Sequence, residues 1–556
     1  MLGKRSAQRS LFDPLMLPHR VPEGSFYGRM GKVSDVLFRD EELAEMYCPD
    51  NGRPSLPPSL MSGVMLLQFY DNVGDEEAVQ RLQFDLRWKV ALGLPLDFAG
   101  FDPSSLTIFR DRLRQFGKER YAFDRMVEVG REAGLLPPKV QVLIDSTHML
   151  GAGATEGTYT LVRHGIRKLL RAMGYHLPQH RKKLGSKLEC YLESGYKPKL
   201  DWANPAARKE HLQELVADAH SVLELALEHT EDEEVRGSGW MLSKILGDDI
   251  SFDEKGQAEI GQGVAEDRIV SVTDSTMRHG HKSSSQRFDG DKSHLVEEPL
   301  TEMLLNMMVG PGNEHDGKKL SPAIDGVEQH YSMKVDRATG DGAYGTGDNR
   351  AEFDERGIDL ISPLAESYGR LGKSHFQIDL ENQKVTCPEG CTTSKWRWVK
   401  DQKKRKVRRF QFPELACLNC PRHKECVGER KKSRTVMLHY HESHLIAARQ
   451  RQKTEEFQVV YHIRAKVERK IAEMVNHGLR QARYIGQEKK ELQALWTGAA
   501  VNLKRLFKLI QEDFCRLRSA LDSLFARKSR PMRLPAVSLL TRSGQTMPFF
   551  RRARLI

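Results

Sequence analysis

Long apolar segments are missing from this sequence of 556 residues. No apolar run approaches the roughly 18 residues that a helix needs to cross a bilayer, so we expect no membrane association. The first residues, MLGKRSAQRS, also lack the apolar centre of a signal peptide, which predicts a cytoplasmic protein. An internal repeat is not evident either. The chain is nevertheless long enough for roughly two or three domains with a sizeable core.

Acidic residues are outnumbered by lysine and arginine, 76 to 87, which gives a net charge of +11. A basic balance attracts polyanions, and DNA or RNA is the usual candidate. The share of hydrophobic residues, 39%, is ordinary for a soluble protein, so it excludes neither an enzyme nor a binding protein. Charge alone is weak evidence for a nucleic-acid partner, because many other soluble proteins are basic.

Cysteine is scarce outside one short segment. Three of the eight cysteines are isolated, and we expect them to be small buried side chains: Cys48, Cys190 and Cys515. In the segment, the spacing Cys417-x2-Cys420-x5-Cys426, with Cys387 upstream, suits tetrahedral zinc. Close thiols in a reducing compartment favour zinc over a disulfide. We therefore predict a structural Zn²⁺ held by Cys387, Cys417, Cys420 and Cys426. With Cys391 as a fifth thiol, the alternative is a thiol-rich insertion without metal.

The N-terminal quarter of the sequence divides into loops and short helices. Three prolines near the start predict that residues 1–50 are rich in loops. Amphipathic helices are expected next: one with Ser59 as its N-cap, one over 76–92 and one over 104–116. This succession resembles a helix-turn-helix module, so we predict a DNA-binding domain over residues 51–135. A purely structural helical cap is the alternative.

Apolar runs typical of strands begin after Pro137 and Pro138. They are expected at 140–145, 268–274, 300–310, 334–345 and 358–365, and strongly helical sequence follows over 444–512. Apolar residues three and four apart predict a helical arm over 155–250, inserted between the first two strands. The pattern favours an α/β core at 136–380 and 435–515. A Cys-rich insertion at 381–434 interrupts this core, and a flexible basic tail is expected at 516–556.

Three acids have the sequence surroundings that metal-assisted phosphodiester chemistry requires. Two divalent ions about 4 Å apart can activate a water and relieve charge at the leaving oxygen, and such hard ions bind carboxylates. Asp145 ends the strand 140–145, Asp341 follows a strand in a glycine-rich turn, and Glu468 lies at the edge of the buried face of a helix. Arg464, one turn earlier, can steady the Glu468 carboxylate or contact a phosphate. Taken singly, each acid also fits an ordinary role as a cap, a turn residue or a solvated ion-pair partner.

Several segments, in order, resemble the DDE insertion-sequence transposases of bacteria. They are residues 52–113, LIDSTHM (143–149), TGDGAYGTGDNR (339–350), YHIRAKVERKIAEMVNHGLRQARYIG (461–486) and GAAVNLKRLFKL (498–509). The resemblance implies an α/β fold: a ribonuclease H-like catalytic core, with a mixed sheet and helices, preceded by an all-helical N-terminal domain. It implies that Asp145, Asp341 and Glu468 hold two Mg²⁺ or Mn²⁺ ions, with Tyr461 and Arg464 as neighbours that contact DNA.

The same resemblance implies an activity and partners. The protein would bind the terminal inverted repeats of an insertion sequence, cut the DNA strand and join the freed 3′-hydroxyl to target DNA. Both steps are in-line phosphoryl transfers. Because two DNA ends must be brought together, a homo-oligomer is expected, located with the nucleoid in the cytoplasm.

Two departures from the family pattern affect the site residues. Relatives often carry a basic residue seven positions after the Glu, where this sequence has Val475, so His477 or Arg480 is expected to substitute. Asp274 in VTDSTMRHG mirrors Asp145 in LIDSTHM. We favour Asp145 as the first acid because VTDS lies where the family's second strand should be. Asp274 is then expected to be a nearby polar residue that supports the metal ligands.

A basic run lies inside the Cys-rich insertion. Residues predicted to neutralise DNA phosphates there are Lys403, Lys404, Arg405 and Arg408. Trp396 and Trp398 are expected to stack on exposed bases, and a solvated hairpin face with core tryptophans is the alternative. For the whole chain, the alternatives to a transposase are a metal-dependent nuclease of the same fold and a catalytically inactive DNA-binding derivative.

Overall fold

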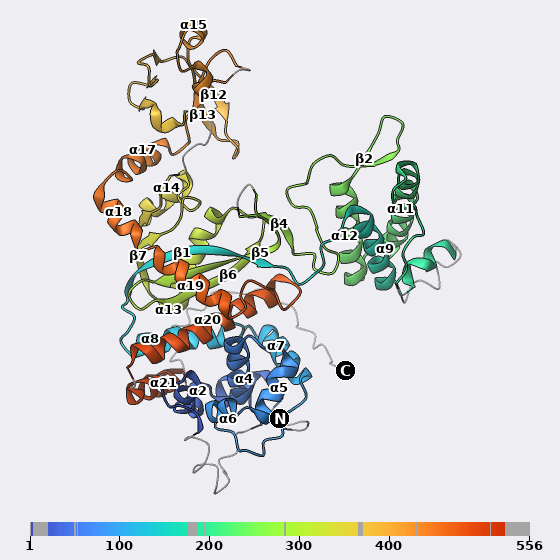
Figure 1. Cartoon of the computed structure of the whole chain (residues 1–556), viewed down its shortest axis with the longest axis vertical. Helices are drawn as coiled ribbons and strands as arrows, with labels where there is room; N and C mark the ends of the chain where they lie inside the picture. The colour runs from blue at the N-terminus through green and yellow to red at the C-terminus, as the bar shows by residue number, and fades with distance from the viewer. Residues whose placement is uncertain are drawn as a thin grey trace, which may run out of the picture.

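A central sheet lies between a helical N-terminal region and a small Cys-rich module, and a helical arm projects to one side (Figure 1). The computed structural model describes residues 2–3, 20–48, 52, 54–174, 186–193, 195–282, 285–364, 371–428, 431–511 and 513–528. Within these ranges, no helix has the length and apolar character needed to cross a membrane.

The central sheet is mixed. Its strands are β1 (Lys139–Leu150), β4 (Arg278–His281), β5 (Arg287–Glu298), β6 (Met303–Pro311), β7 (Lys334–Thr339) and β8 (Asp359–Ile361). The order is β4-β5-β1-β7-β8, and β6 also pairs with β5. The pairs β1–β5, β4–β5 and β5–β6 are antiparallel, whereas β1–β7 and β7–β8 are parallel. β1 therefore lies at the junction between the antiparallel and the parallel halves of the sheet.

Helices cover both faces of the sheet. A Cβ on Gly326 of α13 (Leu320–Tyr331) would meet Asn306 of β6, and a Cβ on Gly498 of α20 (Gln487–Leu509) would meet Met307. Consecutive strand residues point to opposite faces, so α13 and α20 cover opposite sides. α19 (Ala465–Asn476) packs on β1 and β5. This is the mixed sheet with helices that the sequence predicted.

The N-terminal region is helical almost from its first described residues. Its elements are α2 (Phe26–Gly31), α3 (Ser34–Leu37), η2 (Asp40–Met46), α4 (Pro58–Asp71), α5 (Asp75–Phe84), α6 (Leu86–Leu92), α7 (Ser104–Gln115) and α8 (Tyr121–Glu132). Residues 20–48 thus contain three short helices, which corrects the expected loop-rich start; residues 4–19 lie outside the described residues.

Two helix boundaries in this region also differ from expectation. Ser59 does not cap α4: Pro57 holds that position, and the Asp40 side chain accepts the Ser59 backbone N–H at 2.8 Å. The helix expected over 76–92 is divided at Asp85, whose carboxylate accepts the Arg87 backbone N–H at 2.8 Å and caps α6. Asp is a favourable N-cap residue, so a local side chain overrides the helical pattern here.

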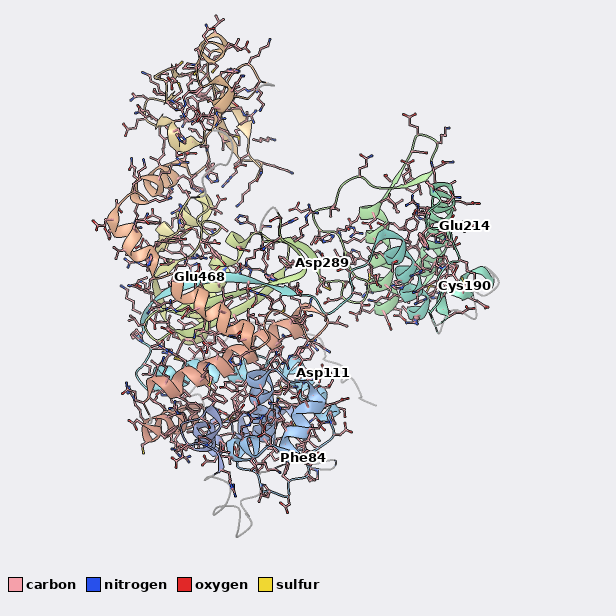
Figure 2. The ribbon with its side chains drawn as sticks, in the orientation of Figure 1. Phe84, Asp111, Cys190, Glu214, Asp289 and Glu468 are labelled. Carbon is pink, nitrogen blue, oxygen red and sulfur yellow. The ribbon has the colours of Figure 1, made fainter. Side chains whose placement is uncertain are left out.

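One hydrophobic core joins the N-terminal helices to the sheet. It includes residues of α4, α8, β6 and α20, with Trp496 of α20 fully buried. The chain beyond residue 515 is not simply a basic tail, because α21 (Phe514–Lys528) packs on α8; residues 529–556 lie outside the described part. Some apolar side chains remain on the surface, such as Phe84, which is 80% exposed at the end of α5 (Figure 2).

The arm is a separate helical unit with its own core. It consists of α9 (Thr158–Ala172), η3 (Ser186–Leu192), α11 (Pro205–Ala226), η4 (Leu227–His229), α12 (Glu233–Asp249) and a hairpin of β2 (Ile250–Phe252) and β3 (Ala258–Ile260). The strand expected at 268–274 is absent from this described stretch. Its apolar residues Ile269 and Val272 instead pack as a loop against the arm's core.

The Cys-rich module consists of two small sheets. They are formed by β9 (Gln377–Asp379), β10 (Lys384–Thr386) and β11 (Thr392–Thr393), and by β12 (Trp396–Lys400), β13 (Lys406–Gln411) and β14 (Thr435–Met437). Three short helical turns complete it: η6 (Lys373–His375), α15 (Glu414–Leu418) and α16 (His423–Cys426). α14 (Gly347–Glu355) precedes the module, and α17 (Glu442–Arg451) and α18 (Glu455–His462) lead back to α19.

Candidate active site

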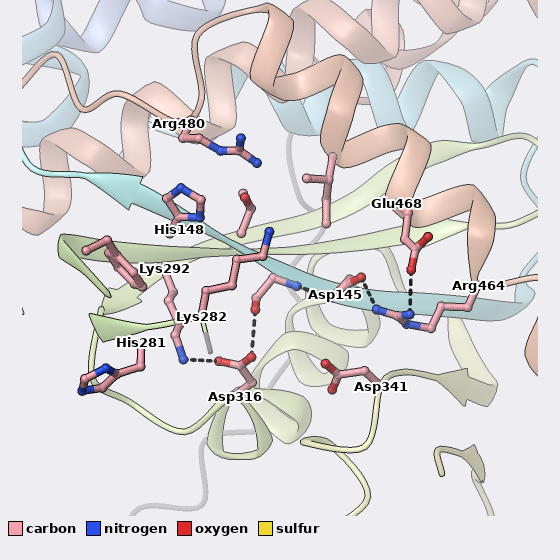
Figure 3. A pocket seen from close by; sticks show the side chains of 14 residues that line it. Asp145, His148, His281, Lys282, Lys292, Asp316, Asp341, Arg464, Glu468 and Arg480 are labelled. Atoms are coloured by element: carbon pink, nitrogen blue, oxygen red, sulfur yellow. Dashed lines mark hydrogen bonds and ion pairs between the residues drawn. The ribbon is translucent and has the colours of Figure 1, made fainter. Parts of the chain in front are cut away.

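A cavity of about 400 Å³ opens over the middle of the sheet (Figure 3). Four carboxylates line it: Asp145, Asp316, Asp341 and Glu468. Basic and imidazole side chains complete the wall: His148, His281, Lys282, Lys292, Arg464 and Arg480. The three acids predicted from the sequence, which are separated by up to 323 positions, therefore line one cavity.

Asp145 lies within β1 rather than at its end. The strand continues to Leu150 because β5 pairs with it from Leu143 onward, with Asp145 opposite Leu295 and Leu150 opposite Gly290. This corrects the expectation that the strand ends at Asp145. The Asp145 side chain is 9% exposed, and its Oδ1 accepts the Ser146 backbone N–H at 2.8 Å. A central strand thus holds this carboxylate rigidly.

Asp341 comes directly after β7, beside Asp145. Leu143 of β1 pairs with Thr339 of the parallel strand β7, so residues two positions further along each strand are neighbours. Asp341 Oδ1 accepts the Ala343 backbone N–H at 2.9 Å. Gly340 allows the close turn, because a Cβ there would lie 2.8 Å from Tyr344 Cδ2 and 2.9 Å from Ile144 Cγ2.

Arg464 joins two of the acids. It precedes Glu468 by one helical turn, and Arg464 Nη1 donates to Glu468 Oε1 at 2.8 Å. Its Nη2 donates to Asp145 Oδ2 at 2.7 Å (Figure 3). The Glu468 side chain is 57% exposed, whereas Asp145 is buried. The guanidinium thus bridges a sheet carboxylate and a helix carboxylate at the entrance of the cavity.

The acids interact electrostatically. Burial raises the pKa of Asp145 from 3.8 to about 6, while Arg464 and the Ser146 N–H oppose the shift. Asp341 and Glu468 raise the pKa of Asp145 further, because like charges nearby disfavour ionisation. Perturbed carboxylates of this kind cluster at functional sites. The cavity therefore holds more negative charge than Arg464 alone balances.

The donor chemistry of these acids suits a hard divalent cation. Mg²⁺ and Mn²⁺ prefer carboxylate oxygens, and three such groups line one wall. In the part of the chain that the structure describes, no three His, Cys, Asp or Glu side chains lie close enough together to hold a metal directly. The Arg464 guanidinium donates to both Asp145 and Glu468, so it lies between these two carboxylates.

Two further predicted residues lie at this site. Tyr461 of α18 is half-buried, and burial raises its pKa, with Arg464 opposing the shift and Asp341 and Asp145 adding to it. Arg480, after α19, lines the cavity. His477 does not, because its Nδ1 donates to the Tyr70 carbonyl at 2.5 Å. Of the two expected substitutes for a basic residue at position 475, the structure therefore brings only Arg480 to the cavity.

Asp274 lies away from the cavity. Its carboxylate and that of Asp291 form ion pairs with Lys490 of α20, at 2.7 and 2.5 Å. All three side chains are at most 1% exposed. The Lys490 ammonium also donates to Thr276 Oγ1 at 3.1 Å. Asp274 thus belongs to a buried ion cluster that ties the base of the arm to α20.

The basic run lies on the hairpin of β12 and β13, outside the cavity. Lys403 and Arg405 form ion pairs with Asp348 of α14, at 2.8 and 2.5 Å. Arg408 lies over the half-buried Trp396 ring, 5.6 Å from its centroid. Lys404, at the hairpin's turn, is exposed. Trp398 is 58% exposed, so it is not a core residue. The basic run therefore holds the Cys-rich module on α14 through ion pairs. The exposed side chains of the hairpin form a basic and aromatic outer face.

The five clustered cysteines line a second cavity, of about 250 Å³. Two tight turns present four of them: the Cys387 N–H donates to the Cys391 carbonyl at 2.8 Å, and the Cys420 N–H donates to the Cys417 carbonyl at 3.2 Å. Cys417 Sγ accepts the Arg434 backbone N–H at 3.5 Å. Cys426 is buried among apolar side chains. Elsewhere the isolated cysteines are not buried as expected: Cys48 and Cys515 are exposed and Cys190 is half-buried.

Four pocket residues were not found from the sequence: Lys292, Asp316, His281 and Lys282. Lys292 lies in β5, whose sequence RFDGDKSHLVEE carries too many charged and glycine residues to indicate a strand. Asp316 follows the turn PGNEH, and nothing local distinguishes it from a surface acid. Among these four, Asp316 has one signal that the sequence offers, since it lies shortly after the predicted strand 300–310.

Two comparisons with protein families connect this site to known proteins. The Transposase domain (DUF772) matches residues 16–112, which include α2 to α7. The Transposase DDE domain matches residues 386–507, which include Glu468 on α19 and most of α20, while Asp145 and Asp341 precede that segment. A comparison with curated proteins finds no significant match. The chain thus carries two segments that match domains of transposases, the DUF772 domain and the DDE domain, and in this it is similar to transposases with a DDE domain.

Proposed function

We propose that the chain is an active DNA transposase of a bacterial insertion sequence, with Asp145, Asp341 and Glu468 as its catalytic acids on a ribonuclease H-like core. The observation that carries the proposal is the convergence of these three carboxylates on one cavity, from β1, from the turn after β7 and from α19. The match to the transposase DDE domain supports the reaction class, which is phosphoryl transfer.

The three carboxylates are proposed to hold two divalent ions, Mg²⁺ or Mn²⁺. When bound, such ions activate the attacking water or 3′-hydroxyl and stabilise the leaving oxygen. The protein's own contribution is positioning. The sheet fixes Asp145, the glycine turn fixes Asp341, and Arg464 keeps Glu468 next to Asp145. Phosphoryl transfer requires that the groups around the reacting phosphate are held rigidly in place, as these carboxylates are.

DNA is the proposed partner, as the terminal inverted repeats of the element and as target. At the cavity, Arg464, Arg480 and Tyr461 would contact the backbone near the reacting phosphate. Further away, the hairpin of β12 and β13 would contact phosphates through Lys403, Lys404, Arg405 and Arg408, and bases through Trp398. A homo-oligomer is proposed because two ends must be held together.

A structural Zn²⁺ is proposed for the Cys-rich module. Cys417 and Cys420 belong to one tight turn, and the backbone N–H donated to Cys417 Sγ would stabilise a thiolate. Cys387 and Cys426 complete the predicted set, and Cys391 lines the same cavity. Metal analysis of the purified protein, with Cys417→Ser as comparison, tests this part separately from catalysis.

Strand cleavage and joining on labelled DNA that carries the element's ends, with Mg²⁺ or Mn²⁺, tests the activity. The wild type should cut and join, while Asp145→Ala, Asp341→Ala and Glu468→Ala should bind DNA without reacting. Asp274→Ala removes the aspartate of the motif that mirrors LIDSTHM, and a folded Asp274→Ala protein should still cut and join. Because Asp274 is buried and paired with Lys490, thermal melting of this variant is measured alongside its activity. Cutting without joining would indicate a nuclease. Binding alone, under every metal, would indicate an inactive derivative.

A further inference from the structure

Lys292 stands on the wall of the cavity that β5 provides, across from α19 (Figure 3). Its ammonium donates to Asp316 Oδ1 at 2.8 Å and to the Glu314 carbonyl at 2.9 Å. The side chain is only 15% exposed. An ammonium has three N–H donors, so these contacts with described residues use two and leave the third for the cavity. Lys292 is therefore a fixed positive charge beside the catalytic acids.

Asp316 links this lysine to the first acid. Asp316 Oδ2 accepts a hydrogen bond from Ser146 Oγ at 2.8 Å, and Ser146 follows Asp145 in β1. The Asp316 side chain is as buried as that of Lys292, at 15% exposed. Lys292 lies opposite His148 in the β1–β5 register, three positions along β1 from Asp145. The network thus holds the lysine and the Asp145 segment in one fixed arrangement.

We propose that Lys292 is a further catalytic residue, which contacts a non-bridging oxygen of the scissile DNA phosphate, and that Asp316 is its positioning residue. This inference rests on the proposed function. Phosphoryl transfer spreads negative charge over the non-bridging oxygens of the phosphate. A preorganised cation in a partly buried site stabilises that charge without reorganising. In this role Lys292 acts through its positive charge and a hydrogen bond, and no proton is transferred.

Two other cations of the cavity, Arg464 and Lys282, are less suited to this role. Arg464 is paired with two of the acids, Asp145 and Glu468. Lys282 follows the end of the short strand β4 and is exposed, so no packing fixes its ammonium. Lys292 combines burial, two short contacts and access to the cavity.

The test uses the full-length protein and DNA ends that are already cut, so that only joining is measured, in a single turnover at saturating protein. Lys292→Met should slow joining roughly 10²- to 10³-fold, the usual loss when one preorganised donor is removed. DNA affinity, measured separately, should change by less than about threefold, because one phosphate contact contributes little to total binding. Lys292→Arg keeps the charge and should recover part of the rate. Lys318→Met, at an exposed position two residues from Asp316, is the matched control and should join like the wild type.

A double variant separates catalysis from a structural ion pair. In Lys292→Met with Asp316→Asn, no carboxylate is left without its partner, so a purely structural role predicts recovery of the rate. The proposal predicts that joining stays slow. Recovery of the joining rate in the double variant, or a wild-type rate in Lys292→Met, would overturn the assignment of Lys292. In either case, joining by the wild-type protein would still support the proposed function. If the wild type itself joined no DNA, the proposed function would fail, and the inference with it.

Discussion

Glu297 lies buried in β5, next to the helix that carries Glu468. It is 0% exposed, between Leu143 of β1 and Leu304 of β6. Among the described residues, neither of its carboxylate oxygens has a hydrogen-bond partner. Burial raises the pKa of Glu297 from 4.5 to about 7, and the nearby Lys470 opposes this shift. The substitution Glu297→Gln keeps the shape of the side chain but removes its ability to ionise.

The expected effect depends on pH in a defined direction. Because the folded pKa is raised, the folded protein keeps the Glu297 proton to higher pH than the unfolded chain does. Wild-type stability should therefore fall as pH rises from about 4.5 to about 7, and should then level off. A difference of 7 less 4.5, or 2.5 pKa units, corresponds to about 3 kcal/mol. Glu297→Gln should match the wild type near pH 4.5 and should be more stable by up to about 3 kcal/mol at pH 8.

Hydrogen exchange measures the stability of the strands around Glu297 locally, which suits a chain with several domains. Peptides from β5 and β6 would be followed in both proteins at pH 5, 6.5 and 8, and the ratio of their exchange rates at each pH removes the intrinsic pH effect. Protection of these strands in the variant should exceed that in the wild type increasingly above pH 5. An equal ratio at all three values, or greater protection of the wild type at pH 8, would refute the reasoning.

Three further predictions follow from buried contacts. Lys490→Met leaves two buried aspartates without their cation and should lower the free energy of unfolding by about 3–5 kcal/mol, which a lower thermal midpoint would show. Lys489→Met, at an exposed site, is the control and should change the midpoint little. Gly290→Ala should weaken the β1–β5 pair, because its Cβ would collide with the Met149 carbonyl; normal thermal stability would contradict this. Purified protein should contain about one zinc ion per chain, lost on chelation and in Cys417→Ser, and zinc-free protein with an intact module would contradict the proposed site.

The three acids chosen from the sequence line one cavity, but their surroundings were predicted less well. Local position alone did not single out Asp341 and Glu468, and the resemblance to DDE transposases did. For Asp145 the expected local structure was wrong, since pairing with β5 extends its strand beyond residue 145. Its environment depends on a partner strand whose own sequence, rich in charge and glycine, does not indicate a strand.

Tertiary contacts explain the other differences. The segment 268–274 has the apolar, β-branched composition of a strand, yet Ile269 and Val272 fill the arm's core from a loop. The sequence could not indicate Lys292 and Asp316 as site residues. They belong to the site because they contact each other across 24 positions of the sequence and because Ser146, on a third segment, donates to Asp316. Sequence motifs therefore indicated acids that share a cavity, and long-range pairing decided which charged groups surround them.

The central claim, that these acids hold catalytic metal ions, is tested most directly by exchanging one ligand atom. In Asp341→Cys a thiolate replaces the carboxylate, and a soft sulfur ligand suits Mn²⁺ better than the oxygen-seeking Mg²⁺. Single-turnover joining of pre-cut DNA ends would be measured for wild type and variant with each metal. The account predicts that the wild type joins with both, and that Asp341→Cys joins with Mn²⁺ but not with Mg²⁺. Equal joining by the variant and the wild type in Mg²⁺ would contradict it.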